Sequence, residues 1–507
     1  MALVDFLLSP YTIPVAILLF YLIPYLTSNT SIRDIPGPFA AKFTNLWLLV
    51  QARRGERYKS VDEAHKKYGK LVRIQPNHVS IADSSAIPLI YGHGNGFLKS
   101  DYYDVFVSIR RGLFNTRDRT EHTRKRKTIS HTFSTKSVGQ FETYMQQNLE
   151  LFTRQWDTLS TNAHGQFSKI DCLNWFNYLA FDIIGDLAFG APFGMLDKGK
   201  DIAAIQMTPG AEITYAPAVE VLNRRGEVSG TLGCLPQLKP YASWLPDPFF
   251  SQGLEAVENL AGIAIARVSQ RLESKQGSER VDLLARLIQG KDESGAKLGR
   301  EELTAEALTQ LIAGSDTTSN TSCAILYWVM KTPGVIAKLQ EELDSAIPQG
   351  TDIPTYEMVK DLRYLRNVIN ETLRIHSTSS LGLHRVIPPS SIDVYILGHH
   401  FPPNTVLSVP TYTIHHSIEI WGPDADSFVP ERWDRLTEKQ KNAFIPFSYG
   451  PRSCVGRNVA EMELALIVST TFRRYEFELY QDTLDTREGF LRKPLECWVG
   501  LRKRANA

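Results

Sequence analysis

One short segment near the C-terminus constrains this chain more than any other feature. It runs from Phe447 to Ala460 (FSYGPRSCVGRNVA) and places Cys454 just before an apolar run typical of a helix. Free N–H groups and the dipole at a helix start favour a thiolate over a thiol. Gly450 and Gly456 lack side chains, which permits a tight turn or the close approach of a flat macrocycle. A single cysteine is usually a buried structural thiol, but the FxxGxRxCxG spacing is far more specific and predicts a haem-thiolate site.

Composition excludes several other classes of protein. The 507 residues include 56 Lys and Arg against 55 Asp and Glu, and 43% are hydrophobic, which is ordinary for a globular protein and excludes a mainly disordered chain. The balanced charge gives no electrostatic reason to bind nucleic acid. The five cysteines are odd in number, lie far apart in the sequence and form no CxxC pair. That pattern excludes a disulfide framework and a zinc ribbon.

The N-terminus carries an uncharged apolar stretch, Phe6–Leu26. As a helix rising about 1.5 Å per residue it would just cross a hydrocarbon core of about 30 Å, although it contains prolines. Met1–Asp5 is not basic, which favours a retained anchor over a cleaved signal peptide. Basic residues follow the stretch, so the rest of the chain is expected on the cytosolic side. We therefore expect one transmembrane helix in an anchor, residues 1–32, and one catalytic domain, residues 33–507, beyond the Pro36–Pro38 turn.

The remainder predicts a mainly α fold with a minor β region (α+β). Lys70–Ile74 and His78–Asp83 alternate apolar and polar residues around Pro76-Asn77, as a hairpin does. A second strand region is expected from Ser391 to Pro410, and residues 140–375 read as helices joined by loops.

The longest predicted helix, Glu301–Thr332, has an unusual middle, with Ala313 and Gly314 followed by Asp316 and Thr317. Glycine there costs about 1 kcal/mol against alanine. One interpretation is a polar kink, because threonine can bond the carbonyl four residues back. The other is that Ala313 and Gly314 admit a flat group while Asp316 and Thr317 handle protons.

Taken together, these motifs resemble those of the cytochrome P450 monooxygenases. Ala313–Thr318 matches the family's oxygen-activation helix, and Glu371–Arg374 (ETLR) matches its ExxR. Glu371 and Arg374 also share one helix face, since they are three residues apart, and without the other motifs they would be taken for a surface pair. The resemblance implies a P450 fold enclosing haem b, with Cys454 as the metal ligand, and a structural triad that Arg432 of FVPERW completes.

The resemblance also implies which residues hold the haem. Phe447 and Arg452 belong to the Cys454 segment, and an arginine can fork onto a propionate carboxylate. The family often has WxxxR on the helix at the haem edge. Here His122 stands at the tryptophan position and Arg126 at the arginine position, with Arg124, Lys125 and Lys127 as competitors. Arg385 is similar in position to the arginine that commonly meets the other propionate.

Tyr91–Ser134, Leu173–Lys198 and Leu303–Ser322 are similar to the fungal benzoate para-hydroxylases within this family. That similarity implies a small aromatic acid as substrate, with benzoate hydroxylated to 4-hydroxybenzoate. A larger lipid, terpenoid or polycyclic arene is the alternative. Substrate contacts are expected from two regions, before the His122 helix and after ExxR: Tyr102, Tyr103, Ser377, Thr378 and Ser379.

Electrons must come from a partner. The chain has no GxGxxG after a strand and no flavin signature, so O2 and NADPH are expected as co-substrates through NADPH–cytochrome reductase. The resemblance also admits cytochrome b5, a membrane lipid surface and the cytosolic face of the endoplasmic reticulum. Two other classes stay open: a haem-thiolate isomerase or dehydratase, which the Asp316-Thr317 pair disfavours, and a haem sensor without turnover.

Overall fold

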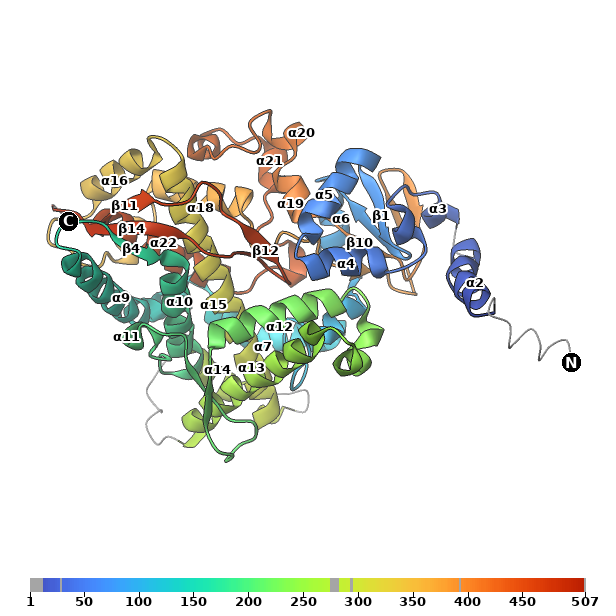
Figure 1. Cartoon of the computed structure of the whole chain (residues 1–507), viewed down its shortest axis with the longest axis horizontal. Coiled ribbons are helices and arrows are strands. Elements are labelled where there is room, and N and C mark those ends of the chain that lie inside the picture. Colours follow the sequence, from blue (N-terminus) through green and yellow to red (C-terminus); the bar gives the residue numbers. More distant parts are fainter. Residues whose placement is uncertain (1–11, 28–29, 274–281, 292–294, 392–393, 506–507) are drawn as a thin grey trace, which may run out of the picture.

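The computed structural model describes residues 12–27, 30–273, 282–291, 295–391 and 394–505. Figure 1 shows a helix-rich body joined to a smaller β-rich part, with helix α2 projecting beyond the β-rich part. The body is built around nine helices of twelve or more residues: α7 (Arg119–Ser130), α9 (Glu142–Asn162), α10 (Cys172–Phe189), α12 (Ala218–Leu232), α13 (Pro248–Glu273), α15 (Arg300–Lys331), α16 (Val335–Ala346), α18 (Arg363–Ile375) and α22 (Arg457–Arg474).

The predicted 301–332 helix is confirmed as α15. It packs against α10, α13, α18 and α22, and about two thirds of its residues are buried. The largest apolar core surrounds it, with Phe152 and Trp156 of α9 among its largest members. Because most of α15 is buried, the small and polar residues in its middle are expected to face a specific neighbour.

The predicted hairpin is also confirmed, as β1 (Leu71–Gln75) and β2 (His78–Ile81). These strands belong to a five-stranded sheet of order β1-β2-β10-β7-β3, in which β10 runs parallel to β2. Its other strands are β3 (Leu98–Lys99), β7 (Arg385–Val386) and β10 (Val406–Ser408). Short helices cover this sheet: α4 (Leu46–Arg54), α5 (Arg57–Tyr68) and α6 (Ala86–Tyr91).

Four smaller sheets complete the β structure of the described residues. Three strands of the order β11-β14-β4 join Tyr475–Leu479, Trp498–Lys503 and Ser168–Asp171, and this pairing of distant segments was not predicted. The others are hairpins: β5 (Ala203–Ile205) with β6 (Thr214–Ala216), β8 (Val394–Ile396) with β9 (His399–Phe401), and β12 (Thr486–Glu488) with β13 (Arg492–Pro494). The β8–β9 hairpin and β10 confirm the strand region expected between Ser391 and Pro410.

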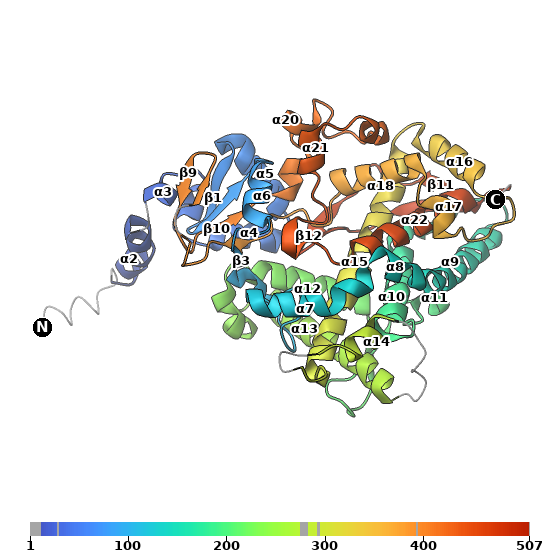
Figure 2. The same cartoon turned by 180° about the vertical axis from the view of Figure 1, so that it is seen from behind.

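Short helices connect these elements, and the view from behind adds α8 and α17 to those labelled from the front (Figure 2). They are α3 (Thr30–Arg33), α8 (Thr135–Val138), α11 (Met195–Lys198), α14 (Leu283–Ile288), α17 (Tyr356–Val359), α19 (Thr411–His415), α20 (Ile418–Trp421), α21 (Glu438–Ala443) and the 3-10 segments η1 (Phe39–Lys42), η2 (Asp101–Phe106), η3 (His131–Phe133), η4 (Gly139–Phe141), η5 (Pro236–Trp244), η6 (Pro430–Asp434) and η7 (Gly450–Arg452).

Helix α2 (Thr12–Thr27) covers most of the apolar stretch in which we expected a transmembrane helix. Residues 6–11 of that stretch lie outside the described part of the chain. Across the described ranges, no helix is both long enough and apolar enough to span a bilayer. The predicted spanning helix is therefore not found among them.

Candidate active site

The loop before α22 is held in one conformation by a hydrogen bond and a glycine. The Cys454 N–H donates to the Phe447 carbonyl at 2.9 Å. Gly450 has φ +70°, and a Cβ there would overlap the Tyr91 carbonyl oxygen, so that position requires glycine. Helix α22 begins at Arg457, and Cys454 precedes its first turn as the sequence predicted.

The Cys454 thiol is both accessible and poorly solvated. All five cysteines are described, and Cys454 alone is exposed. Burial nevertheless raises the pKa of this thiol, and the Gly456 N–H with the charges of Arg126 and Arg457 offsets only part of that rise. The expectation that the helix start makes a thiolate is therefore wrong for the protein alone, because desolvation outweighs the N–H groups and charges. Among the described cysteines, Cys454 is thus the one that a small molecule can reach.

The middle of α15 has an accessible stripe. Ala313 is exposed and Thr317, one turn later, is half-buried, whereas Leu311, Ser315 and Thr318 are buried. The Thr317 hydroxyl donates to the Ala313 carbonyl at 2.8 Å, which is the bond that the kink interpretation expected. Because α15 packs against α22, the helix that follows Cys454, the accessible stripe and the accessible thiol belong to neighbouring elements.

Gly314 is half-buried like Thr317, but its missing Cβ points towards another helix. A Cβ at Gly314 would lie 2.6 Å from Ile184 Cδ1 and 2.8 Å from Ile184 Cγ1, in helix α10. The expectation that Gly314 admits a flat ligand is therefore replaced by a packing role: its missing side chain allows α10 to approach α15. Ala313 is the residue of this pair that faces open space.

Asp316 is held by a lysine that sequence reasoning missed. Lys493 Nζ, from β13, lies 2.6 Å from Asp316 Oδ1, and the Asn320 amide donates to the same oxygen at 3.1 Å. Lys493 also donates to the Asn223 side chain of α12. Asp316 and Lys493 are both largely buried, so the charge pair fixes the direction of the carboxylate. No local pattern in the sequence indicates the Asp316–Lys493 pair, because the two residues are far apart along the chain.

A group of buried basic residues lies near the Cys454 loop and has no carboxylate partner. Burial and mutual repulsion lower the pKa of Arg452 to about 10 and that of His122 to about 3, and lower the pKa of Lys99. Within the described ranges no carboxylate oxygen lies within 4.0 Å of their charged nitrogens, and Arg385 Nη2 is buried without a hydrogen-bond partner. The group comprises Lys99, His122, Arg126, Arg385 and Arg452. These basic side chains therefore have no anionic partner among the described residues. The propionate carboxylates of a haem would supply one.

The competition among basic residues on α7 is resolved by their partners. Arg126 Nη1 donates to the Ser453 carbonyl at 2.6 Å, directly beside Cys454. Lys125 Nζ instead lies 2.6 Å from Glu302 Oε1, and Arg124 also pairs with that carboxylate. Arg452 donates both Nη atoms to the carbonyls of Thr116 and Arg117.

The predicted triad forms a network in which Glu371 and Arg374 are fully buried and Arg432 is half-buried. Arg374 Nε and Nη2 bond the two oxygens of Glu371 at 2.9 and 2.8 Å, and Arg432 Nε lies 3.4 Å from Glu371 Oε1. The indole of Trp433 donates to the remaining side of the same carboxylate. Arg374 also donates to the carbonyls of His415 and Ala425. The pair therefore joins α18 to the segment before α22 and is not on the surface.

The five predicted substrate contacts lie in two places. Tyr102 and Tyr103 are in η2; the Tyr102 hydroxyl accepts from Arg57 at 3.2 Å, and that of Tyr103 is buried without a partner. The other three follow α18. There Ser377 Oγ donates to the Ser379 carbonyl at 3.5 Å, and the Thr378 carbonyl accepts from a backbone N–H of β13. These last contacts are those of an ordinary turn.

Three other cysteines meet in the core, which the sequence did not predict. The sulfur atoms of Cys172, Cys323 and Cys497 all lie within 4.8 Å of one another and are fully buried. They come from the start of α10, from α15 and from the residue before β14. The three clustered cysteines are buried, whereas Cys454 is exposed, so Cys454 is the cysteine that an incoming group can reach.

An accessible cysteine in a constrained loop, a neighbouring helix with an open stripe and a group of basic residues without a carboxylate partner are the features of a haem-thiolate type of site. The family model described as Cytochrome P450 matches residues 36–498, and the chain belongs to that family. The chain is 66% identical over 509 residues to benzoate 4-monooxygenase bphA of Aspergillus niger, covering 98% of each chain. It is 32% identical to cytochrome P450 monooxygenase ORF9 of Penicillium roqueforti, over 89% of this chain and 84% of that one. It is 30% identical to cytochrome P450 monooxygenase cicH of Emericella nidulans, over 88% of each.

Proposed function

We propose that this protein hydroxylates benzoate to 4-hydroxybenzoate. As a cytochrome P450 it is a haem-thiolate monooxygenase that uses O2 and electrons from NADPH through a redox partner. We choose benzoate as the substrate because the chain is 66% identical, over 98% of both chains, to a relative named benzoate 4-monooxygenase. Relatives at about 30% identity carry only the general name of monooxygenase, so the substrate rests on the first comparison.

Cys454 is proposed as the axial ligand of haem b, and its loop supports this role. Haem bound by a cysteine thiolate supplies the binding and reductive activation of O2. Coordination deprotonates a thiol outright, which overcomes the raised pKa of Cys454. Arg126, bonded to the Ser453 carbonyl, brings a positive charge beside the sulfur. Arg452, Arg385 and His122 would meet the propionates, and Phe447 would pack beside the ring.

Asp316 and Thr317 are proposed to move protons. Thr317 sits on the accessible stripe of α15, and its hydroxyl can exchange the Ala313 carbonyl for a water or a bound oxygen molecule. Asp316 lies on the adjacent side of the helix, where Lys493 keeps its carboxylate in place. The Asp316 carboxylate can accept a proton from solvent water and hand it to an ordered water beside the Thr317 hydroxyl, which returns the carboxylate to its ionised form. Ala313 leaves the space, and the triad of Glu371, Arg374 and Arg432 has a structural role.

We propose residues 1–32 as a membrane anchor and residues 33–507 as the catalytic domain. Exposed apolar side chains on α2, including Leu18, Phe20 and Leu26, support attachment to lipid. The proposed location is the cytosolic face of the endoplasmic reticulum. NADPH–cytochrome reductase is the proposed electron donor, with cytochrome b5 as an additional one.

The test is product analysis with the full-length enzyme and a matched reductase in reconstituted membranes. Benzoate should give 4-hydroxybenzoate with NADPH consumed in proportion. The alternative substrates, a medium-chain fatty acid, a monoterpene and a polycyclic arene, should give little product. Preferential oxidation of any of these over benzoate would overturn the proposed substrate and leave the monooxygenase assignment in place.

A further inference from the structure

Arg225, on α12, is a buried arginine with unused hydrogen-bonding capacity. Its side chain is 6% exposed, and its Nη2 donates to the Phe106 carbonyl at 3.1 Å. Its Nε is buried without a hydrogen-bond partner. Burial lowers the pKa of Arg225 to about 10, so the guanidinium remains charged at neutral pH. A buried, charged donor without an acceptor is costly unless something supplies that acceptor.

The cations around Arg225 already have carboxylate partners. Arg57 lies 3.1 Å from Glu488, Arg487 lies 3.2 Å from Glu227, and Lys493 lies 2.6 Å from Asp316. Throughout the described part of the chain, no carboxylate oxygen comes within 4.0 Å of the Arg225 guanidinium. On this side of α15, Arg225 is thus the buried cation that lacks an anion.

Arg225 lines a pocket beside the proposed oxygen-activation helix. The pocket has a volume of about 150 Å³, and it includes Ile312 and Asp316, which are one turn apart on α15. Phe490 lines it too, and the ring of Phe490 packs 5.0 Å from Phe106 and 5.1 Å from Phe114. A cavity of that volume is known to accept a single benzene ring. The lining of the pocket is mixed: aliphatic and aromatic side chains such as Leu222 and Phe490 stand beside the Lys493–Asp316 and Arg487–Glu227 ion pairs. Arg225 is the cation of this lining that has no carboxylate oxygen within 4.0 Å among the described residues.

We propose that Arg225 binds the carboxylate of the substrate and thereby selects an aromatic acid and its orientation. This inference rests on the proposed function and deepens it. A guanidinium binds a carboxylate through two parallel N–H···O bonds, which fix direction as well as position. The carbon para to the carboxylate is the ring atom farthest from that anchor. Holding the carboxylate at Arg225 therefore presents the para carbon to the reacting centre and accounts for 4-hydroxylation.

The experiment compares Arg225→Gln with the wild-type haem-loaded enzyme. Binding of benzoate and of nitrobenzene, its uncharged isostere, is measured by spectral titration and by equilibrium dialysis. Loss of a charge-assisted pair should raise the Kd of benzoate by about 10- to 100-fold and leave that of nitrobenzene unchanged. Arg225→Lys keeps the charge but not the fork and should fall between the two.

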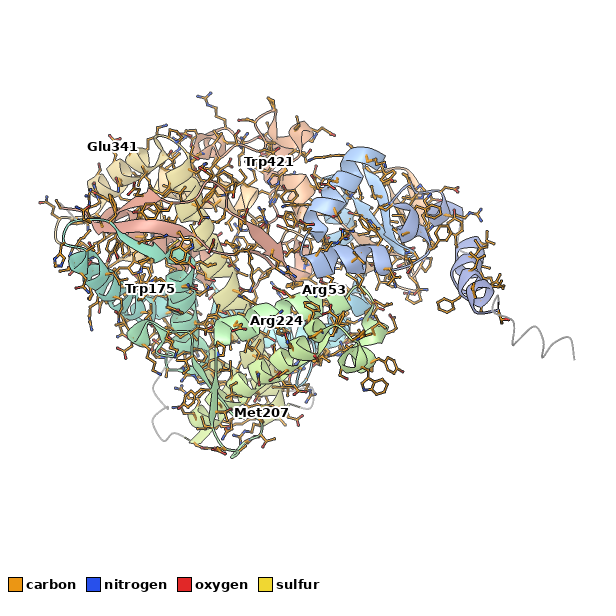
Figure 3. The ribbon with its side chains drawn as sticks, in the orientation of Figure 1. Arg53, Trp175, Met207, Arg224, Glu341 and Trp421 are labelled. Atoms are coloured by element: carbon orange, nitrogen blue, oxygen red, sulfur yellow. The ribbon has the colours of Figure 1, made fainter. Side chains whose placement is uncertain are left out.

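Arg224→Gln is the matched control. It removes the same charge from the neighbouring position of α12, where the side chain is 37% exposed and lies 4.0 Å from Glu227 (Figure 3). It should leave both Kd values unchanged. In Arg225→Gln the remaining product from benzoate should also lose its para preference, a change that a merely structural role would not cause.

The outcomes separate this inference from the proposed function. Suppose that wild-type enzyme makes 4-hydroxybenzoate and that Arg225→Gln binds benzoate as tightly as wild type does. Arg225 is then structural, and the inference is overturned while the proposed function stands. If wild-type enzyme neither prefers benzoate to nitrobenzene nor makes 4-hydroxybenzoate, the proposed function fails as well. Should Arg225→Gln not incorporate haem, a structure of the wild-type complex with benzoate decides: a carboxylate out of hydrogen-bond reach of Arg225 would overturn the assignment.

Discussion

Replacing Gly314 with alanine tests whether this glycine serves helix packing or ligand access. The new Cβ would lie 2.6 Å from Ile184 Cδ1, whereas carbon atoms pack at about 3.5–4.0 Å. Such overpacking typically costs about 1–3 kcal/mol. Alanine regains about 1 kcal/mol of helix preference, so the net loss of unfolding free energy should be up to about 2 kcal/mol. Urea unfolding of the haem-loaded protein, followed by circular dichroism, measures it.

The double variant sharpens this test. Ile184→Ala alone should cost about 2–5 kcal/mol, because it removes buried carbon atoms. With Gly314→Ala present, the cost should be smaller than the sum of the two single losses by about 1–3 kcal/mol, since the clash and the cavity cancel. Additive losses would refute the packing argument. So would an unchanged stability with an altered spectrum of the reduced carbonyl complex, which would place Gly314 at the ligand.

Four further outcomes are expected. Thr317→Ala should bind haem and substrate normally but divert NADPH electrons to peroxide; unchanged yield of product per NADPH would exclude Thr317 from proton transfer. Lys493→Met should cost about 3–5 kcal/mol in urea unfolding and slow hydroxylation, because it strands the Asp316 carboxylate; an unaffected enzyme would contradict that pairing. Burial lowers the pKa of His415 to about 3, so the unfolded chain binds a proton there below about pH 6.5 and the folded protein does not. Stability should therefore fall as pH drops from about 6.5 towards 3, and acid titration of the unfolding midpoint with the His415→Gln variant as reference would show whether this residue contributes. Deleting residues 1–30 should shift protein from the membrane to the soluble fraction without loss of the haem spectrum; an unchanged distribution would argue against the anchor.

Local patterns predicted much of this fold and site. The α15 boundaries were expected within one residue, because a long proline-free helix stops at a proline and begins near a glycine. The β1–β2 hairpin followed from two-residue alternation around a turn. The Cys454 loop was recognisable because its glycines, arginine and cysteine are contiguous, and the structure gives Gly450 the positive φ that such a turn requires.

What escaped prediction depends on contacts between distant segments. The Asp316–Lys493 pair, the three-cysteine cluster and the open guanidinium of Arg225 all require knowledge of which helices and strands meet. Gly314 was misread for the same reason, since only the structure shows Ile184 of α10 against it. The thiol of Cys454 was expected to be acidic from its helix start, but the extent of its burial is a property of the whole fold.

The central claim, that Cys454 holds a haem through its sulfur, is tested most directly by the spectrum of the reduced carbonyl complex. Wild-type enzyme should show the red-shifted Soret band of a thiolate-bound haem, and Cys454→Ala should lack it. Single alanine variants of the four buried cysteines should keep the band: Cys172, Cys234, Cys323 and Cys497. A thiolate-type band that persists in Cys454→Ala, or that disappears in a variant of the three-cysteine cluster that still binds haem, would contradict the account.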